Sequence, residues 1–415
     1  MRIIADFHIH SKYSRAVSRE MTLENIDFWA QKKGINVMGT GDFTHPVWFN
    51  EIKTKLEPAE EGLYKLKSDT PPFATRFILT TEISSIYSKN GRVRKIHNLI
   101  FVPSIEAVEK INTKLGWIGN LKSDGRPILG LDSKELAKII FEADERCVLI
   151  PAHAWTPWFS VFGSMSGFNS LEECFEELTP KIFAIETGLS SDPKMNWRLS
   201  MLDKISLISN SDSHSLQKIG REANVFDCEF SYDGIIDAIK SRDPKKFLFT
   251  VEFFPEEGKY HYDGHRLCNI SFSPEESKKY NNICPVCGKK LTIGVLNRVE
   301  ELADRTEGEA AGSGRVPYKS LISLDEIIAD VLGVGKVSKK VLEMYERVIK
   351  EIGTEFEILL DLPYEKISNF DSKLASAIKN VREGKVEVIP GYDGEYGKIS
   401  IFKDKKDENL QTKLF

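Results

Sequence analysis

Strand-like and helix-like segments alternate from Met1 to about Phe254, and this alternation restricts the fold more than any other feature of the chain. Short apolar runs suit buried strands, and amphipathic stretches between them, such as 133–144, suit covering helices. Repeated strand–helix units predict an α/β fold with a mostly parallel sheet that closes, or nearly closes, into a barrel. The seven strand-like runs are 3–8, 35–41, 77–84, 96–102, 147–151, 182–187 and 205–209.

Histidine and carboxylate residues follow nearly every one of these runs. Six of the eight histidines lie there, and His8 and His10 face the same way if the first run is a strand. Any one of them alone suits an ordinary surface or core histidine, but their recurrence at strand ends, where barrels place their chemistry, indicates a multinuclear metal centre. Such ligands suit zinc, manganese or iron. The predicted ligands are His8, His10, Asp42, His45, Glu82, His97, His153, Asp212 and His214.

Two acidic residues are expected to act in catalysis. Glu82 suits a bridging position because its two oxygens can serve two metal ions. Asp192 precedes Pro193, so it fits a helix N-cap with proline at the first helical position. Asp192 also fits a proton carrier for the attacking water or the leaving group, and the two roles are compatible.

An aromatic segment follows His153. One interpretation is a loop that packs its own rings. The other is a stacking pocket for a nucleobase beside the metals, with an amide for the base edge. The residues of this predicted pocket are Trp155, Trp158, Phe159, Phe162, Phe168 and Asn169.

The cysteines predict a second, structural metal site. His265 and Cys268 form one ligand pair, and Cys284 and Cys287 form another fifteen residues later. This spacing is typical of tetrahedral zinc, and four protein ligands leave no open position for a substrate. His261 is a rival for the histidine position. We assign 256–305 to a zinc-ribbon-like domain that follows a barrel domain at 1–255.

Residues 306–415 are expected to form a mainly helical domain. Two amphipathic stretches flank Gly333-Val334-Gly335, which resembles a helix-hairpin-helix but also fits a plain helical hairpin. In the first interpretation, Lys336, Lys339 and Lys340 contact DNA phosphates. The C-terminal residues Gln411, Leu414 and Phe415 resemble a shortened clamp-binding peptide, which makes the sliding clamp PCNA a candidate partner.

Composition restricts the function less than these motifs do. The net charge of −5 neither indicates nor excludes a nucleic-acid binder, since a local basic groove can hold phosphates. We see neither a long apolar run nor a signal-peptide pattern, so we expect a soluble, cytoplasmic and nucleoid-associated protein that does not contact membranes.

The barrel motifs resemble those of the PHP (polymerase and histidinol phosphatase) family, over about residues 1–250. The resemblance implies a (β/α)7 barrel that holds two or three divalent ions (Zn²⁺, Mn²⁺, Fe or Mg²⁺) and hydrolyses phosphoesters. One feature departs from the family pattern: Asp42 and His45 are three positions apart, whereas the family commonly has adjacent Asp-His after the second strand.

The order of barrel, zinc ribbon and helical domain, with the segments 186–197 and 260–268, resembles the endonuclease Q family over essentially the whole chain. The resemblance implies a DNA repair endonuclease that acts on damaged DNA, single- or double-stranded. It would cut 5′ of uracil, hypoxanthine, xanthine and abasic sites. The alternatives are a PHP small-molecule phosphatase and a non-catalytic, DNA-binding or clamp-tethered scaffold.

Overall fold

A strongly bent sheet forms the first part of the computed structural model, which describes residues 1–67, 75–310 and 314–402. β1 pairs in parallel with β2, and β2 pairs in parallel with β5; a long β5–β6 hairpin then leads to β8. β9 and β10 pair in parallel, and the segment after β10 returns to β1 through an Ile9–Ser213 bridge. The predicted α/β fold class is confirmed. The ring strands are β1 (Arg2–Asp6), β2 (Val37–Gly39), β5 (Arg76–Lys89), β6 (Arg92–Val102), β8 (Val148–Pro151), β9 (Ala184–Glu186) and β10 (Ser206–Ile208).

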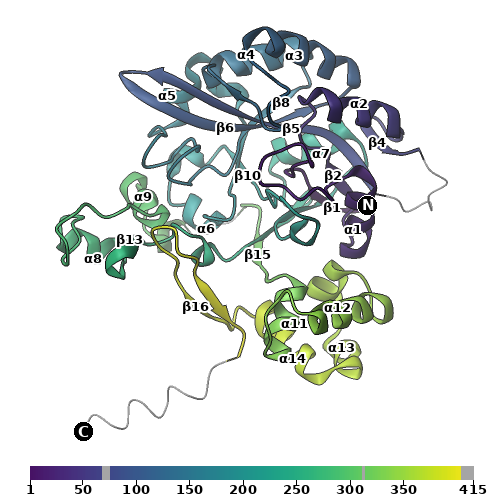
Figure 1. Ribbon diagram of the computed structural model, residues 1–415, viewed down its shortest axis with the longest axis vertical. Helices are drawn as coiled ribbons and strands as arrows, with labels where there is room; N and C mark the ends of the chain where they lie inside the picture. The colour runs from purple at the N-terminus through teal and green to yellow at the C-terminus, as the bar shows by residue number, and fades with distance from the viewer. Residues whose placement is uncertain (68–74, 311–313, 403–415) are drawn as a thin grey trace.

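The prediction of a mostly parallel sheet is wrong for the β5–β6–β8 side of the ring. Asn90 and Gly91 have φ angles of 55° and 71° and join β5 to β6. A two-residue turn with two positive φ angles produces an antiparallel hairpin, not a helical crossover. This hairpin is the long pair of blue strands that extends to the upper left in Figure 1. β6 and β8 are antiparallel as well.

Two strands and a helix that were not predicted extend the sheet beyond β1. β11 (Ala223–Asp227) is antiparallel to β1, and β12 (Phe247–Glu252) is antiparallel to β11. α7 (Tyr232–Ser241) connects them. β15 (Tyr318–Ser320), from the start of the region expected to be mainly helical, adds to β12 in parallel. The chain therefore returns to the barrel sheet before the helical part begins.

The remaining barrel elements cover the sheet or extend its other edge. Their starts follow ordinary capping rules; Ser104, for example, accepts a hydrogen bond from the backbone N–H of Ala107 in the first turn of α3. The helices are α1 (Leu23–Lys33), α2 (Pro46–Lys55), α3 (Ile105–Ile118), α4 (Ser133–Ala143), α5 (Leu171–Phe175) and α6 (Pro193–Asn196). The short strands are β3 (Leu56–Pro58), β4 (Leu63–Leu66) and β7 (Ile128–Leu129).

Two apolar layers hold the barrel together. The inner layer contains Ile3, Ala5 and Phe7 from β1 and the residue after it, and the Phe7 ring contacts Phe101 edge-on at 5.3 Å between centroids. The outer layer lies between the sheet and its helices. Full burial of a side chain such as Phe7 contributes about 1.5–3 kcal/mol to folding. Apolar side chains therefore fill the interior of the barrel, and the polar groups lie at the ends of the strands.

The zinc-ribbon-like part is small and is bound to a C-terminal hairpin. It contains β13 (Asp263–His265), β14 (Ile270–Phe272), α8 (Pro274–Lys279) and α9 (Val295–Leu302). The hairpin of β16 (Glu387–Ile389) and β17 (Lys398–Ser400) reaches back to it. At the hairpin tip, Asp393 accepts hydrogen bonds from the backbone N–H of Arg266 and the hydroxyl of Thr292.

The helical part packs against α1 of the barrel. Lys33 on α1 forms a buried ion pair of 3.0 Å with Glu355, whose carboxylate also accepts the Tyr345 hydroxyl. Figure 1 shows this part as a separate helical lobe below the barrel. None of the helices in the described ranges is both long enough and apolar enough to span a membrane. The helices of the lobe are α11 (Leu324–Leu332), α12 (Lys339–Glu351), α13 (Tyr364–Phe370) and α14 (Ser372–Arg382).

Candidate metal centre

Four predicted ligands form a first cluster at the mouth of the barrel: His8, His10, Glu82 and Asp212. One ligand atom from each lies within 4.8 Å of the others. Nε2 of His10 is 3.1 Å from Asp212 Oδ1 and 3.3 Å from Glu82 Oε2. His8 and His10 therefore point to the same side, and their ring nitrogens and two carboxylates can surround a divalent ion.

Glu82 also belongs to a second cluster, with His97 and His153. Oε1 of Glu82 lies 2.6 Å from His97 Nδ1 and 3.0 Å from His153 Nε2, whereas Oε2 faces the first cluster. One carboxylate thus offers a different oxygen to each set of histidines. This is the geometry of a bridging carboxylate.

Two further carboxylates orient the histidines of the first cluster. The carboxylate of Glu186 is hydrogen-bonded to Nδ1 of His8 and accepts the backbone N–H of His153. The carboxylate of Asp42 is hydrogen-bonded to Nδ1 of His10. These bonds direct the Nε2 atoms toward Glu82 and Asp212. Nε2 of His8 is buried and has no hydrogen-bond partner among the described residues. A buried ring nitrogen without a hydrogen-bond partner is a suitable ligand atom for a metal ion.

The charges of the centre are strongly coupled. Burial alone would lower the pKa of His8, but Glu186, Glu82 and Asp212 hold that pKa well above its usual value. Burial alone would raise the pKa of Glu82, but His97, Arg126 and His8 hold it well below the ordinary value. Glu82 is therefore an anion under ordinary conditions, as a metal ligand must be.

Three predicted ligands lie beside the clusters rather than in them. Both oxygens of Asp42 are engaged, Oδ1 by His10 and Oδ2 by the backbone N–H of Ser11, so Asp42 has the position of an orienting residue. His45 caps α2 and stacks on Tyr13 at 4.5 Å between centroids. His214 lies against the His10 ring at 4.7 Å, with Nδ1 on the carbonyl of Asp212. Within the described residues, neither ligand cluster contains Asp42, His45 or His214.

Half of the residues predicted to form the base pocket are buried in the hydrophobic core. Trp155, Phe162 and Phe168 are at most 1% exposed, so protein covers the ring faces that a base would need. Trp158 and Phe159 are half-buried, and the Phe159 ring lies 4.7 Å from that of His97. Asn169 is exposed and accepts a hydrogen bond from Arg298. Of the predicted pocket residues, only Trp158, Phe159 and Asn169 are exposed enough for a ligand to reach them.

Asp192 occupies the N-cap of α6, and its Oδ1 accepts the backbone N–H of Met195. Its Oδ2 lies 3.4 Å from the Tyr318 hydroxyl, which donates to it. Burial raises the pKa of Asp192 to about 6. The cap is therefore present in the structure, and the raised pKa suits a group that exchanges a proton near neutral pH.

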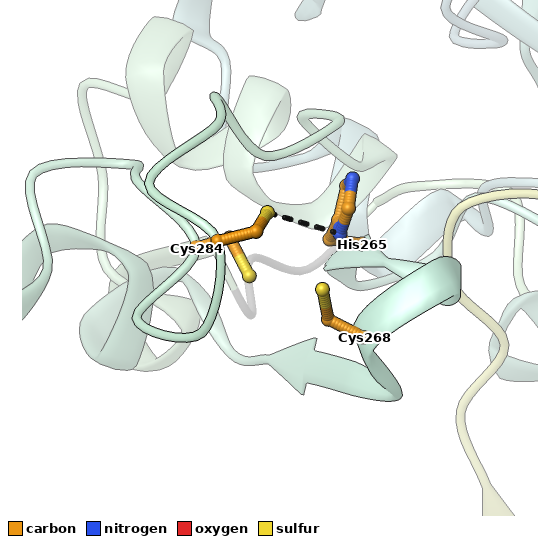
Figure 2. Close-up of side chains that lie close together, drawn as sticks. His265, Cys268 and Cys284 are labelled. Carbon is orange, nitrogen blue, oxygen red and sulfur yellow. Dashed lines mark hydrogen bonds between the residues drawn. The ribbon is translucent and has the colours of Figure 1, made fainter.

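The four predicted zinc ligands come together in the ribbon-like part. His265, Cys268, Cys284 and Cys287 each place a donor atom within 4.8 Å of the others. Figure 2 shows His265 and Cys268, from one segment, and Cys284, from another, with their side chains pointing toward one another. Nδ1 of His265 is 3.7 Å from the Cys287 sulfur. The rival His261 lies outside this cluster, buried and stacked on Tyr262.

The residues predicted to bind DNA phosphate lie around the turn between α11 and α12. Lys336 forms an ion pair with Glu326, and Lys339, at the start of α12, lies 3.5 Å from Glu343 while remaining largely exposed. Lys340 is exposed. Gln411, Leu414 and Phe415 lie outside the described residues.

Two polar residues of the centre, Glu186 and Arg126, are not among the predicted site residues. Glu186 lies at the end of the predicted strand 182–187, and this position alone indicates that its side chain belongs to the centre. Arg126 lies in the segment between α3 and β7 and donates to Glu82 at 3.0 Å. No motif marks Arg126, because it comes from a loop and not from a strand end.

Comparisons with known proteins agree with this architecture. Residues 323–385 match the family described as the MJ0043 C-terminal domain. MJ0043 of Methanocaldococcus jannaschii is 36% identical over 264 residues, which are 62% of this chain and 32% of that protein. The chain thus spans about a third of that relative. YqxK of Bacillus subtilis is 30% identical over 96% of this chain and 99% of its own length.

A solved structure decides the family. The lesion-specific endonuclease PfuEndoQ from Pyrococcus furiosus has a TM-score of 0.86 and 34% identity, and the match covers 99% of both chains. This chain belongs to the endonuclease Q family. A second structure, endonuclease Q in complex with a 27-mer duplex substrate with an abasic lesion at the active site, has a TM-score of 0.85 and 34% identity over 98% of this chain and all of that one. The endonuclease Q resemblance is confirmed over essentially the whole chain.

Proposed function

We propose that this protein is a DNA repair endonuclease that hydrolyses the phosphodiester 5′ of deaminated bases (uracil, hypoxanthine and xanthine) and of abasic sites. The observation that carries the proposal is the pair of ligand clusters joined by Glu82. A lesion-specific endonuclease and a complex with abasic DNA are whole-chain neighbours of this protein, which supports the same substrate class.

Each cluster would hold one divalent ion. A bound pair of such ions supplies Lewis-acid chemistry, since it activates water and neutralises the charge of the phosphate. The chain's own contribution is positional. Glu82 sets the spacing of the two sites, and Glu186 and Asp42 keep His8 and His10 in the tautomer that presents Nε2.

Asp192 is proposed as the proton carrier, because burial raises its pKa to about 6 and its carboxylate lies at a helix start near Tyr318. Phe159 and Trp158 remain the aromatic residues proposed to stack on an extruded base, because both are only half-buried. Phe159 also contacts His97, so a base on this ring would lie beside the second cluster.

The other parts would hold the duplex. His265, Cys268, Cys284 and Cys287 are proposed to bind one structural zinc ion, and Lys336, Lys339 and Lys340 to contact phosphates. Damaged DNA is the proposed partner. Residues Gln411, Leu414 and Phe415 are proposed as a contact to the sliding clamp, and a protein with these functions acts at the nucleoid.

The test is a cleavage assay on oligonucleotides that carry one uracil, hypoxanthine or abasic site, with Mn²⁺, Mg²⁺ or Zn²⁺ and with a chelator as control. We expect cleavage only with metal, one cut 5′ of the lesion, and a 3′-hydroxyl with a 5′-phosphate at the product ends. Absence of any cut beside a lesion would overturn the proposal. Hydrolysis of a small phosphomonoester without DNA cleavage would favour the phosphatase alternative.

A further inference from the structure

Arg126 is a cation in the metal centre that the proposed reaction has not yet used. Its Nη1 donates to Glu82 Oε2 at 3.0 Å, and 28% of its side chain is exposed. Oε2 is also the oxygen that faces His8 and His10, at 3.5 and 3.3 Å. The guanidinium therefore lies next to the first cluster, with part of its surface open.

The loop that carries Arg126 is held firmly in place. The backbone N–H of Gly125 donates to the Tyr13 carbonyl at 3.1 Å, and the Gly125 carbonyl accepts the Thr44 hydroxyl at 3.3 Å. The backbone N–H of Arg126 donates to Asp124 at 3.2 Å. The backbone N–H of Ser84 donates to the Pro127 carbonyl at 3.0 Å, so backbone bonds on both sides fix the position of Arg126.

Gly125 explains how the loop comes so close to the ligands. A Cβ atom on Gly125 would lie 2.3 Å from Asp42 Oδ2 and 2.3 Å from the Ser14 hydroxyl oxygen. Only glycine permits this approach to the carboxylate that orients His10. The backbone beside Arg126 therefore packs directly against the carboxylate that orients a ligand of the first cluster.

Most hydrogen-bonding capacity of Arg126 is unused. A guanidinium has five N–H donors, and Glu82 is its only side-chain acceptor at hydrogen-bond distance among the described residues. Bound divalent ions would take up the charge of Glu82. Arg126 would then be an adjacent cation with free, coplanar donors, and this geometry matches the oxygens of a phosphate.

We propose that Arg126 is a catalytic residue that binds a non-bridging oxygen of the phosphodiester held over the two clusters. This inference rests on the proposed function. Arg126 stabilises the charge that grows on the phosphate oxygens during attack, and it transfers no proton. Binding to the phosphate itself makes its contribution independent of the lesion.

The test compares Arg126→Gln and Arg126→Lys with a matched control, Arg15→Gln. Arg15 is a neighbouring cation at Asp124 whose side chain is 77% exposed. Two substrates are used, a uracil-containing duplex and the small diester bis(4-nitrophenyl) phosphate, and bound metal per chain is measured for every variant.

We expect Arg126→Gln to lower kcat/KM about 100- to 1,000-fold on both substrates, with unchanged metal content. Arg126→Lys should lose less kcat/KM, because lysine keeps the positive charge but not the coplanar N–H donors of the guanidinium. Arg15→Gln should keep a kcat/KM close to that of the wild type on the small diester. Added guanidinium ion should partly restore Arg126→Gln.

Three results would overturn the inference: wild-type rates in Arg126→Gln, a parallel loss of metal, or a loss confined to DNA. The small diester separates this inference from the proposed function. If the wild type hydrolyses the diester but does not cut at lesions, the proposed function fails and Arg126 is still tested. If the wild type hydrolyses neither substrate, both are overturned.

Discussion

Both carboxylate oxygens of Glu186 lie 3.0 Å from Nδ1 of His8. The pair is fully buried, and Asn210 donates a further hydrogen bond of 2.8 Å to Glu186. Nε2 of His8 is consequently the only ring nitrogen left for a metal ion. The residue that orients the first histidine of the chain thus lies 178 positions away from it.

Replacement of Glu186 by glutamine should weaken metal binding at the first cluster. The amide keeps the size of the carboxylate but loses its charge, so His8 becomes a poorer ligand. Loss of such an outer partner typically costs 10- to 100-fold in metal affinity or activity. Metal titration by calorimetry would measure this, with the exposed Glu172→Gln as control. Equal affinities in both variants would contradict an orienting role.

Metal stoichiometry should distinguish a bridging ligand from a terminal one. Glu82→Ala removes an oxygen from both clusters, so we expect loss of both ions and of DNA cleavage. His97→Ala touches only the second cluster, so it should retain one barrel ion. Elemental analysis of the purified variants would count the ions. Equal metal content in the two variants would argue against the bridge.

The zinc ligands should matter for stability and not for the chemistry at phosphorus. Cys268→Ser should lower the zinc content by one ion per chain and lower the melting temperature, because metal binding contributes to folding. Cys228→Ser, which lies outside every ligand cluster of the described residues, should change neither. Hydrolysis of a small diester should survive in Cys268→Ser. Loss of diester hydrolysis in Cys268→Ser would instead indicate that the zinc ion belongs to the active centre.

Asp192 should make the stability of the protein depend on pH. Burial raises its pKa from 3.8 to about 6, so the folded state holds the proton more tightly than the unfolded state. Stability from this group is therefore present below pH 4 and is lost as the pH rises to about 6. Asp192→Asn keeps an N-cap acceptor and should gain about 1–3 kcal/mol at pH 8, but not at pH 4. Chemical denaturation at both pH values measures this, and an equal gain at both would contradict it.

The aromatic segment should separate into core and surface roles. Trp155 is fully buried, and its ring N–H donates to Asn196 at 2.7 Å. Trp155→Ala should therefore cost about 3–5 kcal/mol of stability. Phe159→Ala removes a half-buried ring beside His97 and should lower cleavage of uracil-containing DNA more than it lowers stability. Denaturation and kinetics on both variants give the comparison, and a reversed order would exclude Phe159 as a stacking residue.

Local patterns predicted much of the barrel. Strand and helix periodicity located most ring strands, but β11, α7 and β12 were missed, although α7 is amphipathic. The antiparallel direction of β6 depends on the turn at Asn90 and Gly91, which apolar periodicity does not record. The pattern also could not separate the buried Trp155 and Phe162 from the half-buried Phe159, because burial depends on what packs against a loop.

The sequence by itself determined the ligand types, their places after the strands, and the histidine and cysteine knuckles of the predicted zinc site, because these features repeat at short, regular intervals. Only the tertiary structure decided how the ligands are shared. Glu82 meets two sets of histidines, Asp42 orients His10, and Arg126 reaches Glu82 from a loop 44 positions away. Such relationships arise when distant segments pack together, and no spacing along the chain encodes them.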